Sequence, residues 1–167
     1  MEQFEPQSLA SSAWALAKLS PASRPVWPLW EALARRSVEQ IWEFDPRGLS
    51  NSAWSCATLR CRDGPLLSAV WAAATPRMTE FDEQALSTTL WALAKLLEHK
   101  VPGAASLSGA LLAEVRGRSD LPPQGLANIS WACATLRASD QSLMEALATQ
   151  GSRRLRELQP QHVSNMA

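Results

Sequence analysis

Short polar side chains recur at one position of a repeated sequence pattern. Serine, threonine and asparagine can each donate and accept hydrogen bonds, which is what recognition of a nucleic-acid base edge requires. The residues at this position are Ser11, Asn51, Thr88, Asn128 and Asn165. A second polar position lies one helical turn earlier, and its residues are Gln7, Arg47, Gln84, Gln124 and Gln161. We predict that the two positions form the hydrogen-bonding groups of one binding surface.

Cations and tryptophans continue the same stripe. Lys18 and Lys95, with Arg60 and Arg137 nearby, have the chemistry to meet phosphate groups. The tryptophans between the polar and basic positions are Trp14, Trp54, Trp91 and Trp131. Stacking on bases is one role for them. We favour the other role, packing between successive helices, and predict that Trp54 and Trp131 are buried.

These residues belong to a tandem repeat. The pattern that begins FDPRGLSNSAW at Phe44 also begins at Phe4, Phe81, Leu121 and Leu158, so that the spacing alternates between 40 and 37 residues. Such a period is typical of a solenoid. We expect one array over residues 1–167, with repeats at about 4–43, 44–80, 81–120 and 121–157 and a truncated fifth at 158–167. WALAKL and W(S/A)CATLR each recur after 77 residues, which indicates that a two-repeat unit was duplicated.

Each repeat is expected to begin with a helix, over residues 6–19, 46–59, 83–96 and 123–136. Asp45 is a good N-cap, and Pro46 suits the first helical position. Leu49, Ala53 and Cys56 follow the spacing of one apolar helix face, and the polar stripe occupies the opposite face.

A second helix is expected after a Pro- or Gly-containing turn in most repeats. Its apolar segments are residues 29–33, 66–70, 107–111 and 143–147. Its end is basic, which we attribute to the helix dipole; the residues are Arg35, Arg36, Arg77, Arg116, Arg118, Arg153, Arg154 and Arg156. Because one helical hairpin cannot bury its own apolar faces, the hairpins must stack. The sequence therefore predicts an all-α protein, an α-solenoid of tandem αα-hairpins of 37–40 residues, with eight main helices and a partial ninth.

Composition and residue types limit the kinds of functional site that this chain can form. The chain is 46% hydrophobic and 19% charged with a formal net charge of zero, which suits a folded protein and gives no overall attraction to nucleic acid. Cys56, Cys61 and Cys133 form no CxxC motif, and we expect Cys56 and Cys133 to be buried apolar thiols rather than metal ligands. His99 and His162 are isolated, and no phosphate loop, carboxylate pair or nucleophile motif is present. We expect no enzymatic activity, cofactor, metal, small-molecule substrate or membrane span.

The string F-x-P-Q-x-L-(S/A)-N-x-A-W-A-x-A-x-L resembles the octotricopeptide-type repeats of algal and protist organelle proteins. It is also similar to the helical repeats of FAST-kinase-like proteins and of repeat subunits of the RNA-editing substrate-binding complex. The match is most specific at Pro46, Leu49, Asn51, Trp54 and Ala57, and the departures are Glu83, Leu90 and the pair Ile129-Ser130. The resemblance implies RNA processing, stabilisation or translation in a mitochondrion or chloroplast. Such proteins often carry a C-terminal RAP module, which we do not recognise in this sequence.

Two functions remain open. The first is modular recognition of single-stranded RNA, with one repeat for each base. The second is a protein-interaction scaffold, such as a structural subunit of an organellar ribosome or other ribonucleoprotein, which Trp27, Trp30 and Trp42 favour. We expect the chain to be a fragment or incomplete gene model of a longer array, or a small deletion product, so that a missing targeting peptide says little about the parent protein.

Overall fold

The protein is all-helical where its structure is described. The computed structural model describes residues 4–19, 27–61, 63–96, 102–138 and 140–160. Within these ranges there are eight α-helices, two short 3-10 helices and no strand. The elements are α1 (Pro6–Leu19), α2 (Trp27–Gln40), η2 (Ile41–Glu43), α3 (Pro46–Leu59), α4 (Gly64–Ala74), η3 (Thr75–Glu80), α5 (Glu83–Leu96), α6 (Ala104–Arg116), α7 (Pro123–Leu136) and α8 (Gln141–Arg153). The predicted all-α class and the bounds of all four first helices are confirmed.

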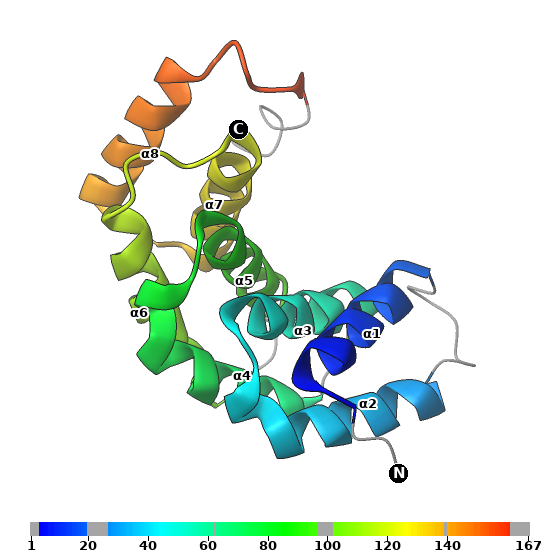
Figure 1. Ribbon diagram of the computed structural model, residues 1–167. Helices are drawn as coiled ribbons and strands as arrows, with labels where there is room; N and C mark the ends of the chain where they lie inside the picture. Colours follow the sequence, from blue (N-terminus) through cyan, green and yellow to red (C-terminus); the bar gives the residue numbers. More distant parts are fainter. Residues whose placement is uncertain (1–3, 20–26, 62, 97–101, 139, 161–167) are drawn as a thin grey trace.

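The helices form a curved stack of hairpins, which confirms the predicted α-solenoid. The odd-numbered helices line the inner side of the arc and the even-numbered helices form its outer layer (Figure 1). The most extensive packing joins successive inner helices, α1 to α3, α3 to α5 and α5 to α7. Contacts between successive outer helices are fewer, as expected when an array curves toward its more closely packed layer. The partial ninth helix and the turn at Ser20-Pro21 lie outside the described residues.

Small side chains allow the inner helices to approach one another. On α3, Leu49, Ala53 and Cys56 are fully buried, as the apolar pattern predicts. Ser52 and Ser55 are also buried, and each hydroxyl donates to a carbonyl of its own helix, at 2.9 and 2.7 Å. A buried hydroxyl that is satisfied within its helix avoids the cost of a lost hydrogen bond. Serine can therefore serve as a small packing residue in this layer.

The second helix of the first repeat buries Trp30 in place of the expected Leu29, while Leu33 is buried as expected. Leu29, the predicted apolar position, is 55% exposed, whereas Trp30 is 1% exposed. Trp30, Leu33 and Ala34 face the core at the i, i+3, i+4 spacing of a buried helix face. In the other second helices the first expected apolar residue is also the first core residue, since Leu66, Leu107 and Leu143 are buried. A tryptophan replaces leucine as the first core residue of α2.

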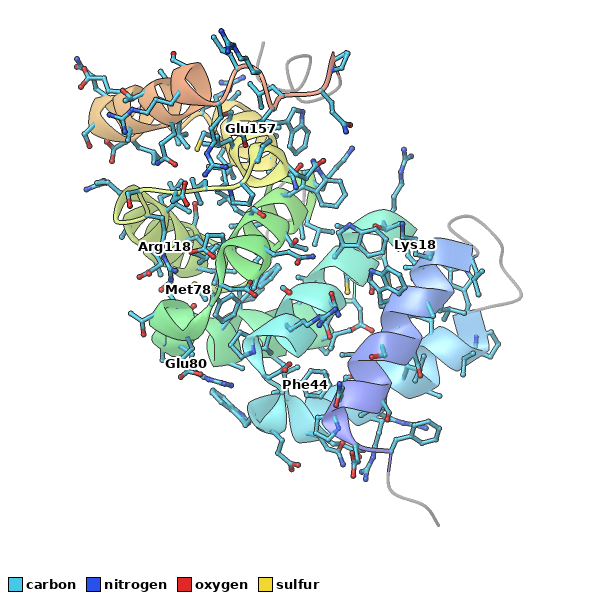
Figure 2. The ribbon with its side chains drawn as sticks, turned by 45° about the horizontal axis from the view of Figure 1, so that its top comes forward. Lys18, Phe44, Met78, Glu80, Arg118 and Glu157 are labelled. Atoms are coloured by element: carbon cyan, nitrogen blue, oxygen red, sulfur yellow. The ribbon has the colours of Figure 1, made fainter. Side chains whose placement is uncertain are left out.

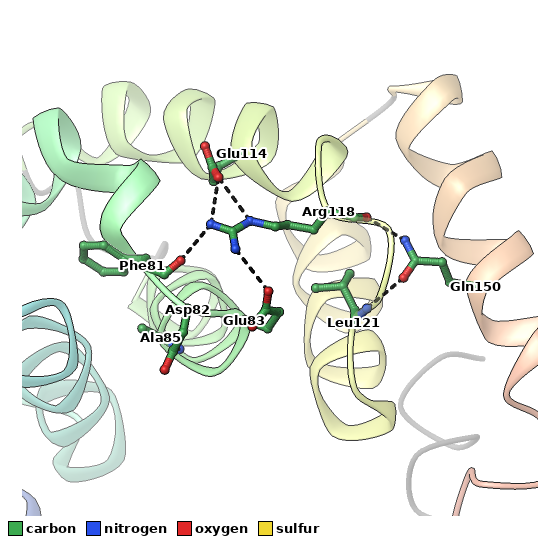
Figure 3. Close-up of polar contacts among 8 residues, drawn as sticks. All are labelled: Phe81, Asp82, Glu83, Ala85, Glu114, Arg118, Leu121 and Gln150. Carbon is green, nitrogen blue, oxygen red and sulfur yellow. Dashed lines mark hydrogen bonds and ion pairs between the residues drawn. The ribbon is translucent and has the colours of Figure 1, made fainter.

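Two arginines that follow the outer helices α4 and α6 donate hydrogen bonds to the backbone at the start of their own repeats. Arg77 Nη1 donates to the Phe44 carbonyl at 2.7 Å, and Arg118 Nη2 donates to the Phe81 carbonyl at 2.8 Å. Arg118 also pairs with Glu83 and Glu114 (Figure 3). Both arginines thus close a repeat on itself, which is a more specific role than the helix-dipole interaction expected from the sequence.

A glutamine performs a similar task in the fourth repeat. Gln150 is buried, and its Oε1 accepts from the Leu121 backbone N–H at 3.0 Å (Figure 3). Its Nε2 donates to the Arg118 carbonyl at 2.9 Å. One amide side chain therefore joins α8 to the linker between the third and fourth repeats.

The 77-residue period is visible in local backbone geometry. Arg60 and Arg137, which end α3 and α7, both adopt a left-handed conformation with φ of 52°. Asp63 and Asp140, which follow them, both cap the next helix through their side chains. The described residues on either side of this turn therefore repeat after 77 residues, as a duplicated two-repeat unit predicts.

Candidate nucleic-acid interface

A hollow of about 550 Å³ opens on the inner helices α1, α3 and α5. It is lined by the predicted polar positions of three successive repeats. These are Gln7 and Ser11 from α1, Arg47 and Asn51 from α3, and Gln84 and Thr88 from α5. Curvature of the array brings together six side chains that are spread over more than 80 residues of sequence.

The fourth repeat contributes a different arrangement. Gln124 Nε2 donates to Asn128 Oδ1 at 2.9 Å, so the two predicted positions of α7 are hydrogen-bonded to each other. Neither residue lines the hollow. The remaining predicted pair, Gln161 and Asn165, lies outside the described residues.

The shorter polar residues of the hollow are available for external partners. Ser11 is exposed, and Asn51 and Thr88 are half-buried. No hydrogen bond joins any of these three side chains to another residue in the described ranges. In particular, the Asn51 side chain forms no hydrogen bond to a neighbouring helix among the described residues.

Two carboxylates also border the hollow, and the sequence did not suggest this. Asp45 and Asp82 each precede an inner helix. Asp45 Oδ1 accepts from the Gly48 N–H at 2.6 Å, and Asp82 Oδ1 accepts from the Ala85 N–H at 2.7 Å. The N-cap role of Asp45 was predicted from sequence. Its position at the border of the hollow was not, because that position depends on where the inner helices begin in space. One end of the hollow is therefore acidic, and Arg47 is the cation among its described lining residues.

Lysines and tryptophans form two matching clusters further along the inner helices. The rings of Trp14 and Trp54 are 6.2 Å apart at 36°, and those of Trp91 and Trp131 are 6.4 Å apart at 39°. The Lys18 ammonium lies 5.6 and 5.8 Å from the first two ring centroids. Figure 2 shows Lys18 at the C-terminal end of α1.

The second cluster has the same geometry. Lys95 lies 5.9 Å from the Trp91 centroid and 5.4 Å from that of Trp131. These distances are within the range of cation–π attraction. We refer to the two clusters as the Lys–Trp–Trp triads. Each triad joins the two repeats of one duplicated unit.

Trp54 and Trp131 lie between successive inner helices, as predicted, but they are less buried than predicted. Trp54 and Trp131 pack against the core between neighbouring inner helices, yet both are half-buried, and Trp14 is 41% exposed. The fully buried tryptophans are Trp30 and Trp71, each 1% exposed, on the outer helices. The stripe tryptophans therefore pack between successive inner helices and remain partly accessible.

The cysteines are buried free thiols, which confirms the packing role expected for Cys56 and Cys133. Burial raises the pKa of Cys56 well above its usual value, and the nearby Cys61 and Asp63 raise it further. Burial and the charge of Asp140 raise the pKa of Cys133 to about 11. A thiol that stays protonated is a poor nucleophile and a poor metal ligand.

Other site chemistries find no support among the described residues. They contain no group of three or more His, Cys, Asp or Glu residues arranged to hold a metal ion. His99 and His162 lie outside them. A search of the same residues finds no helix with the length and apolar character needed to cross a membrane.

Comparison with protein-family models gives no matching family, and comparison with curated proteins gives no match.

Proposed function

We propose that this chain binds single-stranded RNA through the concave face of its inner helices. The observation that carries the proposal is the hollow on α1, α3 and α5, because six side chains selected for hydrogen-bonding chemistry line one concave space. Helical-repeat RNA binders read one base per repeat with two or three side chains. The three repeats that border the hollow each supply two.

Acidic residues lie at one end of the inner face and lysines at the other. The carboxylates of Asp45 and Asp82 border the hollow near the N-terminal ends of α3 and α5. Lys18 and Lys95 lie seven residues beyond Ser11 and Thr88, about 10 Å along each helix. Phosphates are repelled from the acidic end and attracted to the lysines. RNA would therefore direct its bases into the hollow and its backbone along the lysine end.

The tryptophans of the two triads lie between the base-binding and phosphate-binding positions. Trp14 belongs both to the hollow and to the first triad. Aromatic side chains stack on bases at about 1–3 kcal/mol for each base. Trp14, which is 41% exposed, can support a base whose edge is read by Ser11.

The cellular role follows from the repeat resemblance. We place the chain in RNA processing, stability or translation in a mitochondrion or chloroplast. Four repeats that each read one base would give a site of about four to five nucleotides, so the affinity should be modest. Such an array is best suited to act within a longer protein or a ribonucleoprotein.

The test is the salt dependence of RNA binding. Fluorescence anisotropy with a labelled random single-stranded RNA, from about 20 to 200 mM salt, compares wild type with Lys18→Ala/Lys95→Ala. Loss of two phosphate contacts should weaken binding and lower the log–log salt slope by about 1.4, at about 0.7 for each phosphate of a single strand. The control is Arg35→Ala/Arg153→Ala, which removes two exposed cations from outer helices.

The control variant should bind like wild type. Absence of binding at the lowest salt, or equal weakening by both double variants, would contradict the proposal.

A protein-interaction scaffold is the second candidate, and one observation favours it. Trp42 is 65% exposed and Leu29 is 55% exposed, on η2 and α2 of the outer layer. Trp30, which the sequence suggested as part of the same surface, is instead buried. Docking through apolar side chains depends little on salt, so the titration that tests RNA binding also separates the two functions.

A further inference from the structure

The polar position one helical turn before Ser11, Asn51, Thr88 and Asn128 holds glutamine in three of the four described repeats. In the second repeat it holds arginine. The corresponding residues on α1, α5 and α7 are Gln7, Gln84 and Gln124, whereas α3 carries Arg47. Arg47 is exposed and lines the hollow between Gln7 and Gln84. The second repeat therefore presents a different set of hydrogen-bonding groups at an otherwise uniform position.

The Arg47 guanidinium is not used by the fold. It forms no ion pair or hydrogen bond with any residue in the described ranges. Asp45 and Asp82 line the same hollow, but each carboxylate accepts from a backbone N–H of its own helix. By contrast, Arg77 and Arg118 bind carbonyls and carboxylates of their own repeats. Arg47 thus lines the hollow with a guanidinium that has no partner among the described residues.

The difference between the two side chains corresponds to a difference between two bases. Guanidinium offers several donors and no acceptor, and its two parallel N–H groups match the O6 and N7 acceptors of guanine. A glutamine amide offers one donor side and one acceptor side, which matches N6 and N7 of adenine. In single-stranded RNA both of these base edges are accessible.

We infer that Arg47 makes the second repeat a guanine reader, an inference that rests on the proposed RNA-binding function. Asn51, one helical turn along α3, lies in the same hollow and makes the second contact to the same nucleotide. A phosphate contact is the other role open to a free arginine. The negative charges of Asp45 and Asp82 repel a phosphate from this end of the hollow, whereas they attract the positively charged Arg47 guanidinium.

Selection from a random single-stranded RNA pool tests the inference with four proteins. Wild type should enrich guanine at one fixed position of its site. Arg47→Gln should remove that preference, and Arg47→Lys should do the same while keeping the charge, because a lysine lacks the planar fork. The loss should be about 10-fold or more in discrimination between guanine and the other bases, as for a bidentate base contact.

The fourth protein, Gln84→Arg, should gain a second guanine at the adjacent position. Circular dichroism melts establish that each variant is folded. A guanine preference that survives both Arg47→Gln and Arg47→Lys would show that another residue reads the base, and uniform weakening by Arg47→Gln for all four bases would indicate a simple charge contact. Either result would overturn the assignment. RNA binding with no guanine position would overturn this inference alone, whereas no RNA binding by wild type would overturn the proposed function as well.

Discussion

The ammonium of Lys95, on α5, lies 5.4 Å from the ring centroid of Trp131 on the neighbouring inner helix α7. Lys18 has the same relationship to Trp54, one duplicated unit earlier. Thr58 and Thr135 occupy the lysine position on α3 and α7, so a lysine spans every second helix–helix seam. The inner face therefore has two periods: the polar positions recur in every repeat, and lysine-capped tryptophan pairs recur in every second repeat.

Replacing Arg118 should destabilise the array more than replacing its neighbour Arg116. Arg118→Ala removes bonds to the Phe81 carbonyl, Glu83 and Glu114, and we expect a loss of about 1–3 kcal/mol in the free energy of unfolding. Arg116 forms an ion pair with Asp140 at the surface, so Arg116→Ala should cost about 0–1 kcal/mol. Urea denaturation measures both. Equal losses would mean that the contact to the Phe81 carbonyl adds nothing beyond surface charge.

Tryptophan substitutions should follow burial rather than position in the repeat. Trp71→Ala empties a site that is 1% exposed and should cost about 3–5 kcal/mol. Trp14→Ala alters a ring that is 41% exposed and should cost clearly less, because its transfer from water is incomplete. Thermal or urea unfolding of the two variants gives the comparison. A larger loss for Trp14 would require the inner seam to be more tightly packed than the structure indicates.

The left-handed backbone conformation of Arg60 and Arg137 should lower the free energy of unfolding of the protein. Both adopt φ of 52°, a left-handed conformation that costs most residues about 1–2 kcal/mol and glycine very little. Arg60→Gly and Arg137→Gly should each raise the free energy of unfolding by up to about 1 kcal/mol. If these arginines meet phosphates, the same variants should bind RNA more weakly. Substitution that lowers the melting temperature would show that the arginine side chains stabilise these turns.

Alkaline pH should destabilise the protein partly through Cys133. Its pKa is about 11 in the folded state, against an ordinary 9.0. The unfolded chain therefore loses this proton first as pH rises, so the stabilisation is complete below about pH 9 and is lost as pH approaches 11. Between pH 8 and pH 10.5 the urea midpoint should fall less in Cys133→Ala than in wild type. Parallel declines in the two proteins would contradict a raised thiol pKa.

The inner helices could be predicted closely from sequence because their signals are local. Pro46 and Leu59 bound α3 as expected, and Asp45 caps it through its side chain. Leu29 misled the prediction for α2, because both Leu29 and Trp30 are apolar and only packing decides which of them is buried. Local patterns gave the bounds of the inner helices, and they left undetermined which of two adjacent apolar residues is buried.

Longer-range features could not be predicted in the same way. Arg118 binds a backbone carbonyl 37 residues away, and a carbonyl has no signature in the sequence. The polar positions were identified from their periodicity, but their convergence on one hollow depends on the curvature of the array. The acidic border formed by Asp45 and Asp82 follows from the same curvature. Sequence therefore identified the groups, and the structure supplied their common space.

The central claim is that the inner polar positions read RNA bases, and a selection experiment tests it most directly. Wild type and the variant Asn51→Ala/Thr88→Ala/Asn128→Ala are used to enrich a random single-stranded RNA pool in parallel. The control variant is Ser106→Ala/Thr149→Ala/Ser152→Ala, which changes three exposed polar residues of outer helices. Melting should change little in either variant, since Asn128 alone of the three inner residues has a hydrogen-bonded side-chain partner, Gln124.

The account predicts that wild type and the control enrich the same short site of about four to five nucleotides, at one base for each repeat. The inner triple variant should enrich different sequences or none, while its binding to RNA in general keeps the salt dependence given by Lys18 and Lys95. If wild type and the inner triple variant enrich the same sequences with the same affinity, these positions do not read bases and the account is contradicted.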